Sequence, residues 1–155
     1  DGWRVNRPCR QVEIRNCRFN GGHAAIAIGS GMSGGVENIF VHHCTINGTE
    51  RGIRLKTIPG RGGYIRNVLF QDITIRHIPL EAIEISMAYG SSTVVPLSQA
   101  LPHIEEITFS RISGNDLATG VSLCGLPESP LQNIHLDEVN LPGQHPDRLE
   151  YVTLA

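Results

Sequence analysis

A repeat of about 27 residues constrains this chain more than any other feature of its sequence. Five apolar anchors recur at intervals of 27, 29, 39 and 27 residues; they are Val12, Ile39, Val68, Ile107 and Ile134. A second apolar residue follows each anchor after two positions, and a third residue, apolar or cysteine, follows after five. Self-similarity at such a period is typical of a solenoid, in which each repeat packs only against its neighbours.

Four of the repeats contain a second pair of alternating apolar residues, namely Ile26/Ile28, Ile53/Leu55, Ile83/Ile85 and Val121/Leu123. Alternation along short runs separated by bends predicts β-strands rather than helices. Such strands close into coils that pair with the coils above and below. We therefore predict an all-β chain, a single parallel β-helix domain of about five coils over residues 1–155. The 39-residue interval predicts an insertion around Ala88 to His103.

Charge and composition exclude several classes of partner. The net charge of −2 argues against a general nucleic-acid binder. No stretch approaches the roughly 20 apolar residues that cross a bilayer, so we expect no membrane partner. The four cysteines lack metal-finger spacing, and Cys17 and Cys44 share an inward position on adjacent coils, which predicts buried thiols. His42 and His43 are neighbours on one strand, should face opposite sides, and make a poor metal pair. We expect no metal and no cofactor.

Two other polar features have structural explanations. Asn38, Asn67 and Asn133 each directly precede an anchor, which predicts stacked amides at a corner of the coils. The glycine-rich bend 29–35 lacks the Lys-Ser/Thr ending of a phosphate-binding loop, so a tight turn explains its glycines.

The stretch 51–56 is the strongest candidate for a functional site. Ile53 and Leu55 alternate with Arg54 and Lys56, so the apolar pair can enter the core while both cations face solvent together. Aligning the repeats predicts these neighbours on adjacent coils: Ala27 and Glu84 for Arg54, Gly29 and Ser86 for Lys56, Ala24 and Glu81 for Arg51, and Glu50 for His23. The small residues leave an open groove above the cations, with His23 at its rim and Tyr89 within reach from below.

Surface ion pairs alone, worth at most about 1 kcal/mol each, account for the arginines but not for Lys56, which meets no acid in this alignment. An arginine offers a fork to a carboxylate, and a lysine offers a point charge. The pattern therefore predicts a site for an anionic polysaccharide whose carboxylates lie across the coils.

Several motifs in this order resemble the polygalacturonase family, family 28 of the glycoside hydrolases, and the likeness covers nearly the whole chain. They are Gly22-His23, Ile28-Gly29-Ser30 with Met32-Ser33-Gly34-Gly35-Val36, Arg51-Gly52-Ile53-Arg54-Leu55-Lys56, Gly60-Arg61-Gly62-Gly63, and Gly125-Leu126-Pro127-Glu128-Ser129-Pro130, the last similar to the bacterial branch. The resemblance implies a right-handed parallel β-helix that hydrolyses α-1,4-linked galacturonan in pectin with inversion.

The resemblance also implies roles for individual residues. His23 matches the family's histidine beside the scissile bond, an auxiliary catalytic position. Arg54 and Lys56 match the pair that holds galacturonate carboxylates, and Tyr89 matches a tyrosine that stacks on substrate. We add Arg51 as a substrate-binding candidate. Because pectin is extracellular, the resemblance implies an extracellular or periplasmic location.

The chain also departs from the family. It contains neither the Asn-Thr-Asp motif nor the Asp-Asp pair that supply the family's catalytic carboxylates before the Gly-His motif, and Gly31 stands where the bacterial pattern often has Glu. We expect the chain to be the C-terminal part of a longer family pattern. A β-helix open at its first coil exposes unpaired strand edges, which predicts self-association there.

Three hypotheses remain at this point. The resemblance favours an enzyme, a polygalacturonase-type glycoside hydrolase whose acids come from elsewhere. Without those acids, the cationic groove fits a non-catalytic galacturonan-binding module. A purely structural β-helix repeat, as in an adhesin or spike, is consistent with the fold alone.

Overall fold

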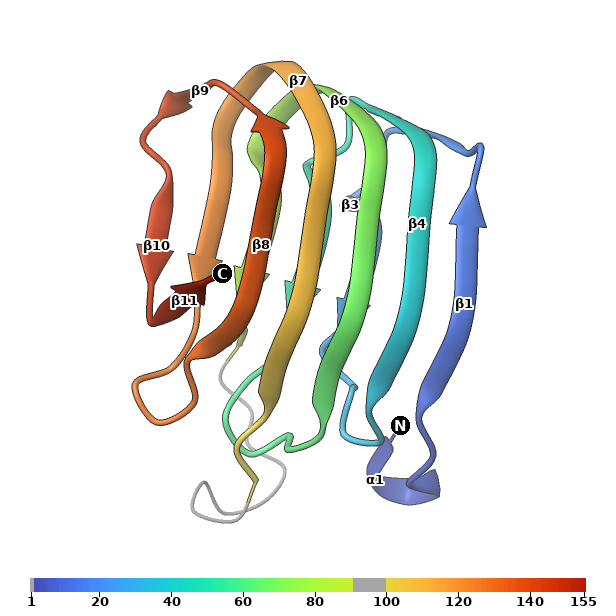
Figure 1. Ribbon diagram of the computed structural model, residues 1–155, viewed down its shortest axis with the longest axis vertical. Helices are drawn as coiled ribbons and strands as arrows, with labels where there is room; N and C mark the ends of the chain where they lie inside the picture. The colour runs from blue at the N-terminus through green and yellow to red at the C-terminus, as the bar shows by residue number, and fades with distance from the viewer. Residues whose placement is uncertain (1, 91–99) are drawn as a thin grey trace.

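The computed structural model describes residues 2–90 and 100–155 (Figure 1). In these residues one short helix, α1 (Gly2–Val5), precedes the strands. The strands are β1 (Cys9–Arg15), β2 (Arg18–Asn20), β3 (Ala24–Gly29), β4 (Val36–Asn47), β5 (Arg51–Lys56), β6 (Tyr64–Ser86), β7 (His103–Cys124), β8 (Leu131–Asn140), β9 (Gly143–His145), β10 (Arg148–Glu150) and β11 (Val152–Leu154). No helix in the described residues is long and apolar enough to span a bilayer.

The strands stack in parallel and in the predicted register. Val12 aligns with Ile39, and Ile39 aligns with Val68. Val68 aligns in turn with Ile107, and Ile107 with Ile134. The five anchors therefore stand in one column, and the prediction of a parallel β-helix is confirmed.

Two walls result from this stacking. β6 and β7 each rise along one side of the molecule, bend over, and descend along the other (Figure 1). β1, β4, β8 and the first halves of β6 and β7 form one wall. β3, β5, β10 and the second halves of β6 and β7 form the opposite wall, which carries the candidate site.

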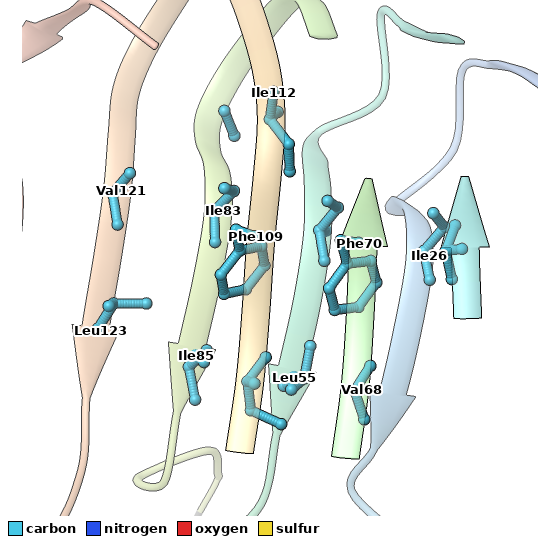
Figure 2. Packing of buried hydrophobic residues seen from close by; sticks show 14 of the residues in the cluster. Ile26, Leu55, Val68, Phe70, Ile83, Ile85, Phe109, Ile112, Val121 and Leu123 are labelled. Atoms are coloured by element: carbon cyan, nitrogen blue, oxygen red, sulfur yellow. The ribbon is translucent and has the colours of Figure 1, made fainter. Parts of the chain in front are cut away.

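The core fills the space between the walls. The rings of Phe70 and Phe109, from adjacent coils, stack with centroids 5.2 Å apart and planes 9° from parallel (Figure 2). Both are fully buried, as are the isoleucines and leucines that alternate along β5, β6 and β7. Cys44 is buried, as predicted, whereas Cys17, on the preceding coil, is only half-buried; both are free thiols.

Bends fall at the same place in successive coils, on residues with left-handed backbone conformation. One such column, with φ of 51° to 59°, contains Gln11, Asn38, Asn67, Glu106 and Asn133. The amide of Asn67 donates a hydrogen bond to Asn38 Oδ1 at 2.6 Å, which confirms the predicted stack for these two residues. Glu106 separates Asn133 from them. Asparagine suits this conformation better than most residues do.

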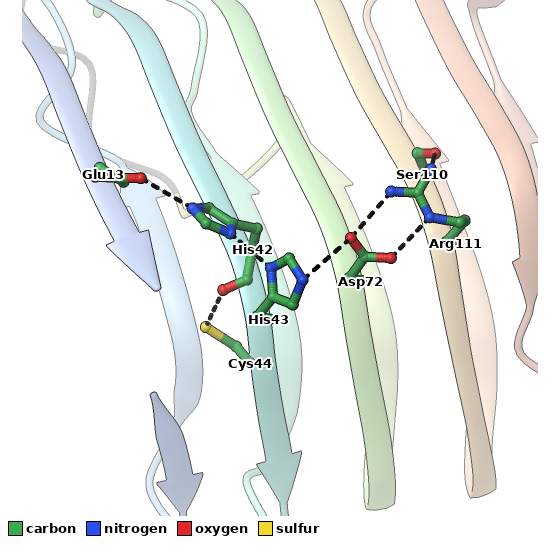
Figure 3. A network of polar contacts seen from close by, with 7 residues as sticks. All are labelled: Glu13, His42, His43, Cys44, Asp72, Ser110 and Arg111. Carbon is green, nitrogen blue, oxygen red and sulfur yellow. Dashed lines mark hydrogen bonds and ion pairs between the residues drawn. The ribbon is translucent and has the colours of Figure 1, made fainter. Parts of the chain in front are cut away.

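The prediction that His42 and His43 face opposite sides is wrong. His43 has φ 53°, which interrupts the alternation of the strand, and the two Nδ1 atoms lie 2.7 Å apart in a hydrogen bond. His42 Nε2 lies 3.0 Å from Glu13, and His43 Nε2 lies 3.7 Å from Asp72. Arg111 donates two hydrogen bonds to Asp72, which lower the pKa of that carboxyl (Figure 3). A polar row thus crosses four coils.

The insertion lies between Ser86, at the end of β6, and His103, at the start of β7. The register confirms that the interval between these two coils is the long one, because Val68 aligns with Ile107. Most of the segment predicted as inserted, residues 91–99, lies outside the described residues.

The two ends of the stack differ. β1, β2 and β3 each pair on one side only among the described strands. The apolar interior opens there into a cavity of about 260 Å³, lined by Cys9, Val12, Ile14, Ile26, Ala27, Ile28, Gly29, Val36 and Ile39. At the other end, β11 pairs with β8, and β9 and β10 pair with β7.

Candidate functional site

β5 carries both cations of the candidate site on its outer face. Ile53 and Leu55 are fully buried, whereas Arg54 and Lys56 are only half-buried, because side chains alternate along a strand. Lys56 is also the only lysine of the 155 residues.

The coil before β5 places only small residues beside the two cations. Ala27 aligns with Arg54 and Gly29 with Lys56, as predicted, and both small residues are exposed. Gly29 has φ +93°, and a Cβ built on it would lie 1.9 Å from the carbonyl oxygen of Lys56. Close backbone packing therefore requires glycine at this position. As a consequence, no side chain projects from residue 29 over Lys56.

The coil after β5 neutralises the arginines. Glu84 aligns with Arg54 and accepts a hydrogen bond from its Nε. Arg51 Nε lies 2.7 Å from Glu81 and 3.3 Å from Glu84. Within the described residues, Lys56 has no carboxylate at ion-pair distance. Lys56 is therefore the uncompensated cation of the site.

The ring of Tyr89 contacts both Arg54 and Lys56. Its ring centroid lies 4.3 Å from Lys56 Nζ and 5.0 Å from the guanidinium carbon of Arg54, which is cation–π distance. The backbone N–H of Tyr89 donates to the carbonyl oxygen of Thr57 at 3.0 Å. Tyr89 as a residue is 38% exposed, so part of it remains available to a ligand.

His23 lies at the other end of β5, beside its predicted neighbour Glu50. Its Nδ1 is 2.8 Å from Glu50 Oε2, and its side chain is 91% exposed. The separation of four positions between the level of Glu50 and that of Arg54 corresponds to about 13 Å along a strand. The structure thus brings Arg54, Lys56 and Tyr89 together, links Arg51 to Arg54 through Glu84, and sets His23 apart at the rim.

The columns of outward-facing residues that contain Arg54 and Lys56 continue over the last coils of the chain. Ser122 and Arg148 continue the column of Arg54, and Cys124 and Glu150 continue that of Lys56. Arg148 donates two hydrogen bonds to Glu150, at 2.8 and 2.9 Å. Extending the alignment of the apolar pairs over the last coils would have identified these residues. The hydrogen bond from Tyr89 to Thr57 could not be predicted from the sequence in this way, because Tyr89 lies in the irregular chain after β6.

The site presents cations and an aromatic ring, but its carboxylates are already paired with arginines. Glu81 and Glu84, the carboxylates nearest the cations, are both engaged by arginines. In the part of the chain that the structure describes, no group of three or more His, Cys, Asp or Glu residues is arranged to hold a metal ion. The geometry therefore suits binding of a carboxylate-bearing ligand.

The contact between His23 and Glu50 makes a testable prediction. The hydrogen bond from His23 is the main cause that lowers the pKa of Glu50 below 4.5, against a smaller opposing effect of burial. Because this pKa is lowered on folding, the contribution to stability is present above pH 4.5 and is lost as the pH falls through the lowered value. In His23→Ala the pKa of Glu50 should rise toward 4.5, measured by the ¹³C shift of its carboxyl.

Glu150 provides the control, because Arg148 lowers its pKa independently of His23. Its titration should be identical in both proteins. An unchanged titration of Glu50 in the variant would contradict the assigned contact.

Comparison with known proteins places the chain in a family. The model of glycosyl hydrolases family 28 matches residues 1–154. A probable polygalacturonase of Vitis vinifera is 29% identical over 136 residues, 86% of this chain and 28% of the relative. A polygalacturonase of Penicillium griseoroseum is 35% identical over 115 residues, 71% of this chain and 30% of the relative.

A solved structure agrees with these matches. The hyperthermoactive exopolygalacturonase from Thermotoga maritima superposes on 99% of this chain and 34% of its own, with a TM-score of 0.81 and 25% identity. The chain thus spans about a third of the length of these relatives. Because the family model matches residues 1–154 and the fold matches that of a solved polygalacturonase, the chain belongs to glycosyl hydrolases family 28.

Proposed function

We propose that this chain binds galacturonan as part of a polygalacturonase-type enzyme that hydrolyses α-1,4-galacturonosyl linkages in pectin with inversion. The observation that carries the proposal is the uncompensated Lys56 beside Arg54 and Tyr89, beneath the small residues of the preceding coil. The relatives named as polygalacturonases support the substrate class.

Each side chain has a role in this proposal. Lys56 supplies a point charge to one galacturonate carboxylate, and Arg54 supplies a second donor while it remains bound to Glu84. Tyr89 offers its ring face to a sugar ring. At the rim, Glu50 holds Nδ1 of His23, so Nε2 is the nitrogen directed toward the substrate chain. Arg51 helps to fix Glu84, and through it the orientation of Arg54.

Inversion needs a general acid and a general base about 6.5–9.5 Å apart, with room for a water molecule. Glu81 and Glu84 do not suit these roles, because arginines engage both. We therefore propose that the catalytic carboxylates belong to a polypeptide segment that packs on the open end formed by β1, β2 and β3. Residues 1–155 would then act as a single β-helix domain, at an extracellular or periplasmic location where pectin occurs.

A second candidate function is non-catalytic binding of galacturonan by this chain. The ion pairs of Glu81 and Glu84 with arginines favour it, since they leave the site with cations but with no acid–base pair next to them.

Lys56→Ala tests the shared part of both functions. Loss of a charged contact worth about 1.5–3 kcal/mol should weaken binding of trigalacturonate about tenfold to a hundredfold, measured by calorimetry at low salt. If the chain also releases reducing ends from polygalacturonate, the variant should lose that activity too; binding without cleavage selects the second candidate.

Arg10→Ala serves as the control for this experiment. Arg10 is an exposed arginine of β1, on the opposite wall from β5. Its loss should leave affinity within twofold of the wild type. Equal affinity of Lys56→Ala and Arg10→Ala would contradict a galacturonan site at Lys56.

We also propose that residues 1–155 alone, with no other polypeptide segment on the open end, self-associate there, because β1, β2 and β3 have unpaired edges and β1 and β3 line an apolar cavity. Sedimentation at micromolar concentration should detect a dimer or larger species. Val12→Lys, at the 36% exposed edge residue, should shift the equilibrium toward monomer, whereas Leu154→Lys at the other end should not. A strictly monomeric wild type would contradict the proposal.

A further inference from the structure

A hollow lies on the outer surface of β2, β4 and the middle of β6, away from the cluster of Arg54, Lys56 and Tyr89. Its volume is about 410 Å³. Its polar lining includes Arg18, Asn20, Thr45, Asn47, Thr74 and Arg76. The proposed function uses none of these residues.

The coil register arranges this lining in two rows. Arg18, Thr45 and Thr74 align across three coils, and so do Asn20, Asn47 and Arg76. The two arginines therefore occupy opposite corners of a patch that spans three coils and three strand positions, two coil spacings and two residue spacings apart. With about 4.8 Å between coils and 3.3 Å per residue, their Cα atoms are about 12 Å apart. Hydroxyl and amide groups fill the space between them.

Within residues 2–90 and 100–155, the two arginines of the hollow have no acidic partner, whereas His77, which also lines the hollow, is bound to Asp116. Among the described residues, neither Arg18 nor Arg76 has a carboxylate at ion-pair distance, and no carboxylate lines the hollow. Outside the described residues, Asp1 is the one acidic residue, because 91–99 contain none. The acids closest in the register are occupied: Arg111 binds Asp72 at 2.7 and 2.9 Å, and His77 binds Asp116 at 2.5 Å.

We propose that this hollow is a second binding site for galacturonan, which takes carboxylates at Arg18 and Arg76 and sugar hydroxyls at the groups between them. Guanidinium groups bind carboxylates with paired hydrogen bonds, and threonine and asparagine both donate to and accept from hydroxyls. Two cations set apart, with neutral polar groups between them, fit an extended polyhydroxylated polyanion better than one compact anion. The choice of a uronate ligand rests on the proposed function.

The hollow and the cluster of Arg54, Lys56 and Tyr89 lie on adjacent faces of the β-helix. Two residues separate Asn20 from His23, and two separate Asn47 from Glu50, and both connections lead to the wall that carries β3 and β5. A second site on this adjacent face would hold another segment of polymer near the enzyme, and would raise the local concentration of substrate.

NMR titration of the ¹⁵N-labelled chain with trigalacturonate tests this assignment. Two separate sets of backbone amides should shift, one around Asn47 and Thr74 and one around Lys56. The double variant Arg18→Ala/Arg76→Ala should weaken binding at the first set at least tenfold and leave the second set unchanged. Lys56→Ala should do the reverse, and Arg10→Ala, an exposed arginine that does not line the hollow, should change neither.

The outcomes separate this inference from the proposed function. Shifts at Lys56 without shifts at Asn47 and Thr74 overturn the second site alone. Shifts at Asn47 and Thr74 alone uphold it and count against the groove. Equal shifts of the hollow amides with a neutral trisaccharide, or with phosphate at the same concentration, overturn the uronate assignment. The proposal is also overturned if the double variant keeps a native amide spectrum and binds trigalacturonate at the hollow with wild-type affinity.

Discussion

Parallel pairing of each coil with the next, in fixed register, is the constraint on which the rest of this structure depends. A shift of one residue between two coils would turn every apolar residue of a strand outward. The column that runs from Val12 to Ile134 shows that the register holds across all five coils. Every outward side chain therefore has defined neighbours about 4.8 Å away on the adjacent coils.

This constraint decides where charge is balanced and where it is not. Arg54 has Glu84 on the next coil, and Arg111 has Asp72 on the preceding one, so both ion pairs follow from stacking. Lys56 has Gly29 and Ser86 as neighbours, and its charge remains available. The same reasoning identifies Arg18 and Arg76, whose columns contain hydroxyls and amides. A solenoid can thus present binding cations simply by placing small or neutral residues beside them.

Much of the fold and part of the site could be predicted from the sequence, because the repeat fixes the register. The neighbours of Arg54 and Lys56 followed directly from aligning Ile53 and Leu55 with the equivalent pairs. The alternation of apolar residues could not predict the backbone conformation at the bends. His43 adopts a left-handed conformation, so strict alternation failed for it and for its contact with His42.

Glycine at position 29 illustrates a different limit. The sequence suggested that a small residue keeps the groove open, whereas the structure gives a stronger reason, since a Cβ there would collide with the backbone of Lys56. The approach of Tyr89 to the cations depends on a hydrogen bond to Thr57 from chain outside the repeat, which periodicity does not describe. The sequence therefore predicts the columns of a solenoid better than the loops that complete its sites.

The most direct test of the central claim uses the fact that Lys56 is the only lysine. Reductive methylation with ¹³C-formaldehyde keeps its charge and gives one lysine methyl signal, distinct from that of the α-amino group. Titration with trigalacturonate should shift and broaden this signal, and salt should reverse the effect. A signal that stays fixed while calorimetry records binding would show that the cations aligned by the register do not hold the uronate.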